Sequence, residues 1–195
     1  LDYALPEKGT ITGKDFTNTD LRGKDLSHLK FENCDFTGAA LDNAEMHRTF
    51  FTDCAMRDAT LTGIQSGQGA TPFKINSFTH CDLRGADFSG ARLARMNLTQ
   101  SNLSGSVWQG ADLETVNFTS SDLTGASFAD VTFSDRVRII GGTLDPDAPE
   151  ILYEIKEASR LDLSHLEETN ASTTQDSSSS WYTSHDMTND SGFEL

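Results

Sequence analysis

A large apolar residue recurs at every fifth position along most of the chain, and the residue two places before it is mostly small. The apolar series runs from Phe16 to Leu61 and again from Phe73 to Phe133. A period of five fits neither an α-helix nor an extended strand. It predicts a chain that turns a corner every five residues and closes a four-sided coil every 20, with successive coils stacked through parallel main-chain hydrogen bonds.

Residues 20 apart should then lie in one column. The step from Leu61 to Phe73 is 12, which predicts that two extra residues are absorbed there. With this correction one column contains only leucine: Leu21, Leu41, Leu61, Leu83, Leu103 and Leu123. The other three read Phe16, Phe36, Met56, Phe78, Leu98, Phe118; then Phe31, Phe51, Phe73, Leu93, Leu113, Phe133; then Leu26, Met46, an interruption, Phe88, Trp108, Phe128. Gly or Asn follows each leucine of the first column by two residues, which predicts type II turns at that corner, while the other corners lack so strict a pattern.

The units Cys81-Asp82-Leu83-Arg84-Gly85, Ala86-Asp87-Phe88-Ser89-Gly90 and Ser121-Asp122-Leu123-Thr124-Gly125 resemble the A(D/N)LXX unit of pentapeptide-repeat proteins. The resemblance covers residues 14–133 and implies an all-β fold, a right-handed quadrilateral β-helix. We expect an N-terminal lead over residues 1–13, the β-helix over 14–140, a C-terminal cap over 141–166 and an acidic, Ser/Thr-rich tail over 167–195 that stays disordered.

The cap is predicted to contain a helix at about 148–160. Asp147 is its expected N-cap, with Pro149 in the first turn. Ile151, Leu152 and Ile155 fall on one face, which would seal the last coil. The alternative is that this helix carries a homodimer contact.

Two segments are candidate interaction sites. Residues 64–72 break the repeat and are expected to bulge as a loop from the face of Leu26, Met46 and Trp108. Loops on a rigid scaffold often carry function, so its candidate contact residues are Gln65, Ser66, Gly67, Gln68, Gly69 and Ala70. In the tail, the aromatic and apolar residues Trp181, Tyr182, Phe193 and Leu195 are candidates for a short binding motif.

Charge narrows the classes of partner. The 195 residues carry a formal charge of −15, with −5 in residues 1–143 and −10 in residues 144–195. This balance argues against direct binding to nucleic acid or anionic membranes, and no apolar run is long enough for a transmembrane helix. Outward arginines, including Arg22, Arg84 and Arg95, are expected to lie solvated beside rows of Asp.

No catalytic or metal-binding arrangement is apparent, and no cofactor is predicted. The five His show no metal spacing. Cys34 and Cys54 are 20 apart, so they should stack as buried thiols; a disulfide is the alternative, although the stacking distance is long for one.

The predicted function is a noncatalytic protein-interaction scaffold with a protein partner. The opening Gly13-Lys14-Asp15-Phe16…Leu21-Arg22-Gly23-Lys24-Asp25-Leu26-Ser27 is similar to the start of the repeats in pentapeptide effectors delivered by type III secretion, which would place the protein in the bacterial cytoplasm or in a host cell. The family resemblance also implies two alternatives: a DNA mimic that binds topoisomerases such as gyrase, or the substrate-recognition part of a larger bacterial ubiquitin ligase. Full mimicry would need on the order of 17 charges along six coils, more than the repeats supply.

Overall fold

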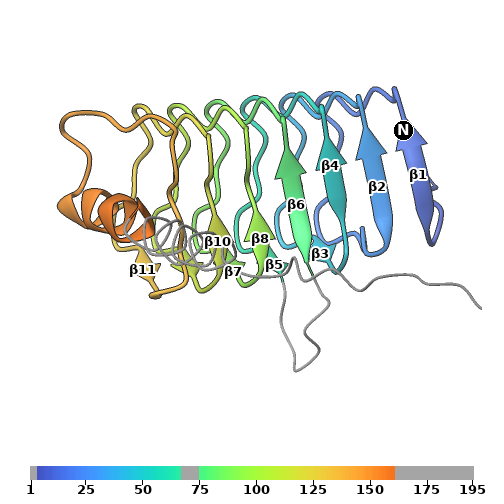
Figure 1. Ribbon diagram of the computed structural model, residues 1–195. Coiled ribbons are helices and arrows are strands. Elements are labelled where there is room, and N and C mark those ends of the chain that lie inside the picture. The colour runs from blue at the N-terminus through green and yellow to red at the C-terminus, as the bar shows by residue number, and fades with distance from the viewer. Residues whose placement is uncertain (1–3, 67–74, 161–195) are drawn as a thin grey trace, which may run out of the picture. The chain divides into compact units, whose positions relative to one another are not determined.

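The computed structural model describes residues 4–66 and 75–160, which form a β-solenoid of about six turns followed by one helix over residues 150–160 (Figure 1). The predicted β-helix with a C-terminal helix is therefore confirmed. The tail from residue 161, including Trp181, Tyr182, Phe193 and Leu195, lies outside the described residues.

Two of the four solenoid faces are parallel sheets. The first sheet has the order β1-β2-β4-β6-β8-β10 and the second the order β11-β9-β7-β5-β3. The strands of the first sheet are β1 (Gly9–Thr12), β2 (Leu29–Glu32), β4 (Phe50–Thr52), β6 (Asn76–Thr79), β8 (Met96–Asn97) and β10 (Val116–Asn117). Those of the second sheet are β3 (Glu45–Met46), β5 (Gln65–Ser66), β7 (Arg92–Leu93), β9 (Asp112–Leu113) and β11 (Thr132–Phe133).

The other two faces are held by single parallel bridges, and we name them by one core residue each. The Phe16 face stacks Phe16, Phe36, Met56, Leu83, Leu103 and Leu123, through bridges such as Asp15 to Asp35 and Ala55 to Asp82. The Trp108 face stacks Leu21, Leu41, Leu61, Phe88, Trp108 and Phe128, through bridges such as Thr60 to Asp87 and Asp87 to Val107.

These columns correct the predicted register across the break. Leu83 and Leu103 share a face, as expected, but Leu61 stacks on Phe88 and not on Leu83. The pairing steps are 27 residues across the break, as from Gln65 to Arg92, and 20 in the coils around it, as from Arg92 to Asp112. Seven extra residues are therefore inserted, not two, so every predicted column is wrong by one face at this point. Phe73, taken as a column member, lies outside the described residues.

The turns are more uniform than predicted. Residues with positive φ follow all four faces; Asn43 (55°), Gly105 (67°), Gln100 (54°) and Arg95 (57°) represent the four corners. The hydrogen bond from Ser106 N to Leu103 O, at 3.1 Å, closes a type II turn after the Phe16 face. The backbone therefore adopts a positive φ at many turn positions that are not occupied by glycine.

The core is a continuous stack of apolar side chains. Phe31, Phe51 and Phe78 lie one above the other in the first sheet, with ring centroids 4.9 and 4.7 Å apart. On the Trp108 face, Phe88 and Trp108 stack at 4.2 Å, and the Trp108 indole N–H donates to Ser106 Oγ at 2.7 Å. This hydrogen bond satisfies the one polar group of a fully buried side chain.

The N-terminal boundary of the solenoid differs from the prediction. β1 pairs with β2, so the solenoid begins at Gly9 and not at residue 14. The helix over 150–160 agrees with the predicted range of about 148–160, and a turn in which the Ala148 N–H donates to Asp145 O at 3.0 Å precedes it. Leu152 is 1% exposed, and Ile139 N donates to Ser159 Oγ, so this helix packs on the last coil as expected of a cap.

Candidate protein-interaction site

The inserted residues leave and re-enter the solenoid at one corner, between the second sheet and the first. β5 ends at Ser66 and β6 begins at Asn76. Gln65 and Ser66 were expected in the loop, but they pair with β3 and β7, and the buried Ser66 hydroxyl donates to Ala94 O at 3.3 Å. The other four predicted loop residues, Gly67, Gln68, Gly69 and Ala70, lie outside the described residues.

This position also corrects the predicted face of the loop. The insertion follows the column of Leu26 and Met46, as expected, but Trp108 stands in the column before it. The error has the same origin as the register, because a step of seven moves the later coils on by one face. We call this position the insertion corner.

A groove of about 410 Å³ lies along the insertion corner, and we name it the arginine groove. Its lining residues are Ile75, Arg95, Asn97, Thr115, Val116, Asn117, Arg136 and Arg138. Ile75 is 43% exposed, whereas Val116 is buried. The groove thus combines an exposed apolar side chain with three guanidinium groups and two amides.

The three arginines meet because the coils stack. Met96 pairs with Val116, which places Arg95 and Asn97 beside Thr115 and Asn117 of the next coil. Asn117 in turn bridges to Arg138. Arg138 Nη1 donates to the carbonyl oxygens of Asp135 at 2.7 Å and Val137 at 3.2 Å, which holds its side chain over the last coil.

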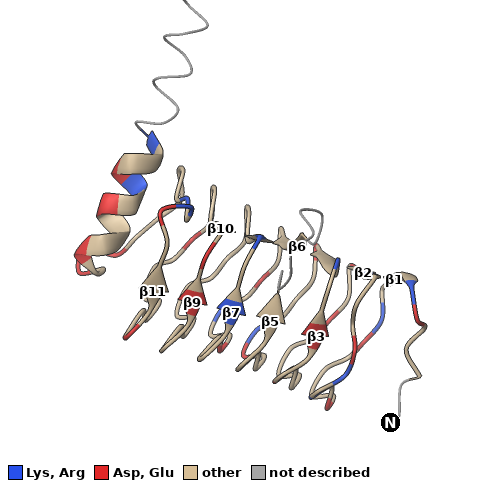
Figure 2. Ribbon diagram, turned by 90° about the horizontal axis from the view of Figure 1, so that it is seen from below, with Lys and Arg blue, Asp and Glu red and all other residues tan. Residues whose placement is uncertain are grey.

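The electrostatic character of this corner differs from that of the chain as a whole. Lys30 and Arg48 lie on the same edge in earlier coils, and Lys and Arg positions recur along it in Figure 2. The Glu114 carboxylate lies 3.8 Å from Arg136, and both side chains are exposed, so this ion pair is weak. A basic edge on an acidic protein is a surface that attracts carboxylate or phosphate groups.

The Phe16 face carries the acidic row that DNA mimicry would require. Asp15, Asp35, Asp82 and Asp122 occupy equivalent positions, but Ala55 and Asn102 interrupt them. A hydrogen bond from Arg84 lowers the pKa of Asp82, and hydrogen bonds from Thr124 and Thr143 lower that of Asp122. These groups are therefore ionised at neutral pH.

Arginines neutralise the middle of that row. Arg57 Nε lies 2.8 Å and Arg84 Nη2 2.7 Å from the same oxygen of Asp82. On the Trp108 face, Arg22 pairs with Asp20 in the same way. These contacts agree with the expectation of arginines beside Asp rows, whereas Arg95 lies in the arginine groove instead.

The cysteines form a column of three, because the 27-residue step places Cys81 above Cys54. Their thiols donate to the first-sheet carbonyls of the preceding coil: Cys34 to Ile11, Cys54 to Phe31 and Cys81 to Phe51, at 3.4 to 3.5 Å. Burial raises the pKa of Cys34, and a hydrogen bond with Cys54 together with burial raises that of Cys81 far above its usual range. Cys34 and Cys81 are thus held as buried thiols.

Within residues 4–66 and 75–160, no group of three or more His, Cys, Asp or Glu side chains is placed to bind a metal ion. Among the described residues, no helix is long and apolar enough to span a membrane.

Comparison with known proteins identifies the family. The family profile for pentapeptide repeats matches in eight copies over residues 12–48, 25–63, 77–106 and 97–135. The chain belongs to the pentapeptide-repeat family. No curated protein sequence matches it.

Several solved structures are similar. QnrB1, a plasmid-mediated fluoroquinolone resistance protein, is 21% identical, with 75% of this chain and 95% of that chain covered and a TM-score of 0.36. Rfr23 from the cyanobacterium Cyanothece 51142 is 16% identical, with 71% and 86% covered and a TM-score of 0.37. The thylakoid-lumen protein AT2G44920 from Arabidopsis thaliana is 30% identical, with 73% and 77% covered and a TM-score of 0.28.

Proposed function

We propose that this chain is a noncatalytic protein-interaction scaffold whose arginine groove binds an acidic segment of a partner protein. The observation that carries the proposal is the convergence of Arg95, Arg136 and Arg138 on one groove beside the exposed Ile75. Guanidinium groups bind carboxylates through paired hydrogen bonds, and arginine is enriched at protein interfaces. Ile75 adds apolar contact that a simple counter-ion would not use.

Site-specific cross-linking tests this proposal. A photoreactive residue replaces Ile75, and the matched control carries it at Thr62, which follows the Trp108 face on a different corner. The partner cross-linked at position 75 is identified and its affinity for the full chain is measured. The double variant Arg95→Glu/Arg136→Glu should abolish that binding, whereas Arg22→Glu, on the Trp108 face, should leave it unchanged.

Two outcomes would contradict the groove as the binding site. One is equal cross-linking of the same partner from positions 75 and 62. The other is unchanged affinity of the folded double variant, since reversal of two of three groove charges must weaken an acidic ligand. Urea unfolding of each variant establishes that the fold is intact.

DNA mimicry is the competing function, and the acidic row of the Phe16 face is what favours it. We expect weak or no inhibition in a gyrase supercoiling titration, because Arg57 and Arg84 neutralise the middle of the row. Potent inhibition by a chain ending near Arg160 would reverse this ranking. Inhibition lost on that truncation would indicate a nonspecific effect of the acidic tail.

The proposed partner class is a host protein bound by a secreted bacterial effector. The support is the similarity of residues 13–27 to the first repeats of type III effectors, and the location follows from that similarity alone. A translocation reporter fused to the full-length protein tests it, with a secretion-deficient strain as control. Recognition of substrates for a bacterial ubiquitin ligase is the alternative, and it requires a catalytic domain joined to the full-length gene product.

A further inference from the structure

The last coil of the solenoid is covered on three sides and open on the fourth. Thr143 bridges to Asp122 and continues the Phe16 face. Val137 and Ile139 extend the first sheet, and Ile151 and Ile155 of the helix flank Phe133 of the second sheet. On the Trp108 face, no described residue of a later coil forms a β-bridge with residues 126–130, which we call the end rung.

The end rung presents unused backbone groups in a known arrangement. One coil earlier, Trp108 N and Gly110 N donate to Ser127 O and Ala129 O at 2.8 and 2.9 Å, and Ser106 O accepts from Ser127 N at 2.9 Å. The equivalent groups are the N–H of Phe128, the N–H of Asp130 and the C=O of Ala126. Among the residues that the structure describes, none of these three has a backbone partner.

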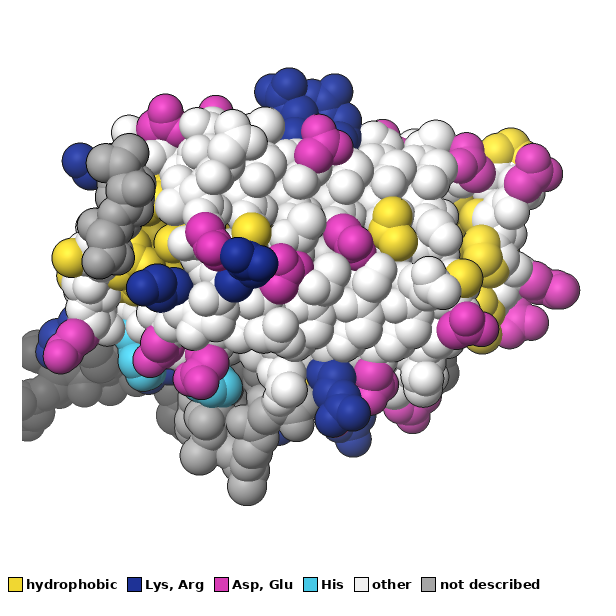
Figure 3. All heavy atoms as spheres, turned by 180° about the vertical axis from the view of Figure 1, so that it is seen from behind, with side chains coloured by type: hydrophobic (Ala, Val, Ile, Leu, Met, Phe, Trp, Pro, Cys, Tyr) yellow, Lys and Arg dark blue, Asp and Glu magenta, His cyan; other side chains and the backbone are white. Residues whose placement is uncertain are grey.

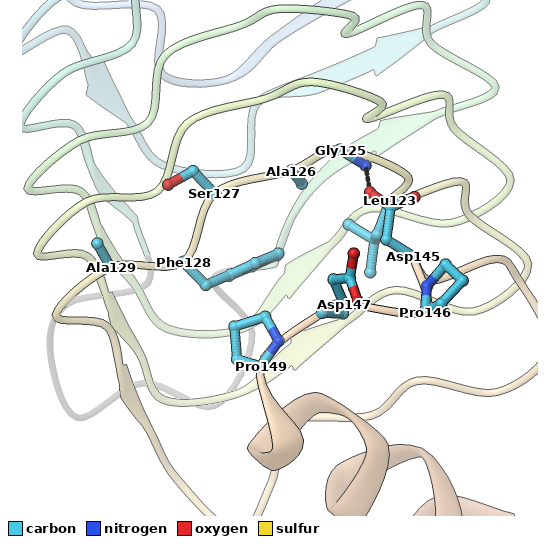
Figure 4. A pocket seen from close by; sticks show the side chains of 11 residues that line it. Leu123, Gly125, Ala126, Ser127, Phe128, Ala129, Asp145, Pro146, Asp147 and Pro149 are labelled. Carbon is cyan, nitrogen blue, oxygen red and sulfur yellow. Dashed lines mark hydrogen bonds between the residues drawn. The ribbon is translucent and has the colours of Figure 1, made fainter.

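A hollow of about 640 Å³ lies over these groups, between the end rung and the loop before the helix (Figure 4). Leu123, Ala126 and Phe128 line it on one side, and Pro146, Ala148 and Pro149 on the other. Phe128 is 7% exposed, whereas Trp108 below it is fully buried. Figure 3 shows exposed hydrophobic side chains at both ends of the solenoid, including the helix-bearing end.

Carboxylates surround this apolar floor. Asp145 and Asp147 line the hollow, and the Asp145 carboxylate accepts a hydrogen bond from Gly125 N. Figure 4 shows Asp147 between Phe128 and Asp145. Asp130 lies at the end of the rung and is exposed. With no basic residue in its lining, the hollow favours a positively charged occupant.

We propose that the end rung binds an extended basic peptide segment of a partner protein, which adds one β-rung to the Trp108 face. The peptide would accept hydrogen bonds from Phe128 N and Asp130 N and donate one to Ala126 O, as each coil does to the one before it. A small side chain and, two residues later, a large one would cover Ala126 and Phe128, and flanking Lys or Arg would face the carboxylates. This is recognition by strand addition, with main-chain bonds giving affinity and side chains giving selectivity.

The site is independent of the arginine groove, because it lies on a different face and selects the opposite charge. Each of the two proposals can therefore be refuted while the other stands.

The probe is a labelled peptide, Lys-Ser-Val-Trp-Gln-Lys, which places the chain's own Ser106–Gln109 rung between two lysines. Fluorescence anisotropy with the full chain gives its affinity. Amide hydrogen exchange should slow at Phe128 and Asp130 on binding, because both N–H groups become hydrogen bonded. The matched peptide carries N-methyl valine, which removes the one donor that would reach Ala126 O, and it should bind at least about threefold more weakly.

Protein variants separate the contributions. Asp147→Lys should weaken binding about threefold at low salt, whereas Glu45→Lys on the second sheet should not. Ala148→Trp fills the hollow and should abolish binding, whereas Ala40→Trp on the same face two coils from the N-terminal end should not. No binding at about 1 mM peptide, equal binding of the N-methyl peptide, or exchange protection confined to other amides would each overturn the proposal.

Discussion

Replacing Gly142 with Ala should destabilise the C-terminal end of the solenoid more than replacing Gly105 with Ala. Both glycines have a positive φ, 70° for Gly142 and 67° for Gly105. A Cβ at Gly105 meets nothing within 4 Å, whereas a Cβ at Gly142 would overlap the carbonyl oxygen of Ser121 and lie 3.2 Å from its carbonyl carbon. The pair thus separates backbone strain from a steric contact with the neighbouring coil.

The magnitudes follow from these two environments. Alanine in the left-handed region costs about 1–2 kcal/mol, and its smaller unfolded-state entropy returns about 0.4–1 kcal/mol, so Gly105→Ala should cost roughly 1 kcal/mol. Gly142→Ala adds the displacement of backbone in a packed coil, a further 1–3 kcal/mol or so. Gly105→Asn is the matched control, since Asn43 already adopts a φ of 55° at an equivalent turn position, and it should cost less than Gly105→Ala.

Urea unfolding followed by circular dichroism measures the three differences. Amide exchange shows where in the chain the stability is lost. Because the stability of a repeat protein is a sum of contacts between neighbouring repeats, the loss for Gly142→Ala should concentrate in the last two coils. Equal costs for the two alanine variants would refute the reasoning, since they would show that the coil moves away from the added methyl group without penalty.

Three further changes test other parts of the molecule. Deleting residues 67–73 shortens the step from Ser66 to Phe78 from twelve residues to five, the step of the other coils. The fold should be kept, and the free energy of unfolding should rise by about 0.8 kcal/mol because a shorter loop loses less entropy on closure. A loss of stability in urea titration would contradict this. Trp108→Ala should cost about 3–5 kcal/mol, because the indole is fully buried between Phe88 and Phe128; a loss under 1 kcal/mol in the same assay would speak against it. Hydrogen bonds from Arg22, Arg84 and Thr124 lower the pKa values of Asp20, Asp82 and Asp122, respectively. The stability that these ionised carboxylates contribute to the fold should therefore be complete above the ordinary Asp pKa of about 4 and be lost as the pH falls below it. Urea midpoints that already decline between pH 7 and 5 would contradict this explanation.

The fold was predictable because its signal is local. Each five-residue unit carries its own inward residues and turn, so the period identifies the solenoid without any long-range information. The same locality explains the register error. Leu, Phe and Met occupy the inward position interchangeably, as Leu61 on Phe88 shows, and insertions of two and of seven residues shift the period of five by the same two positions, so both satisfy the pattern. The pairings across the break, such as Gln65 with Arg92 and Ala55 with Asp82, distinguish seven extra residues from two.

The candidate sites depend on information that a period lacks, namely which coil lies beside which. Arg95 and Arg138 are 43 residues apart, so the sequence does not show that they meet, whereas the partner of Arg84, Asp82, stands only two residues before it. Once the coils are in register, the difference is one of corner: Arg84 follows the Phe16 face beside an Asp, whereas Arg95 follows the second sheet where the insertion interrupts the wall. The end rung arises in the same way, since its residues repeat the pattern of the coil before and differ only in having no successor. In a repeat protein the regular units therefore specify the scaffold, and the places where stacking is broken or ends are where binding groups become available.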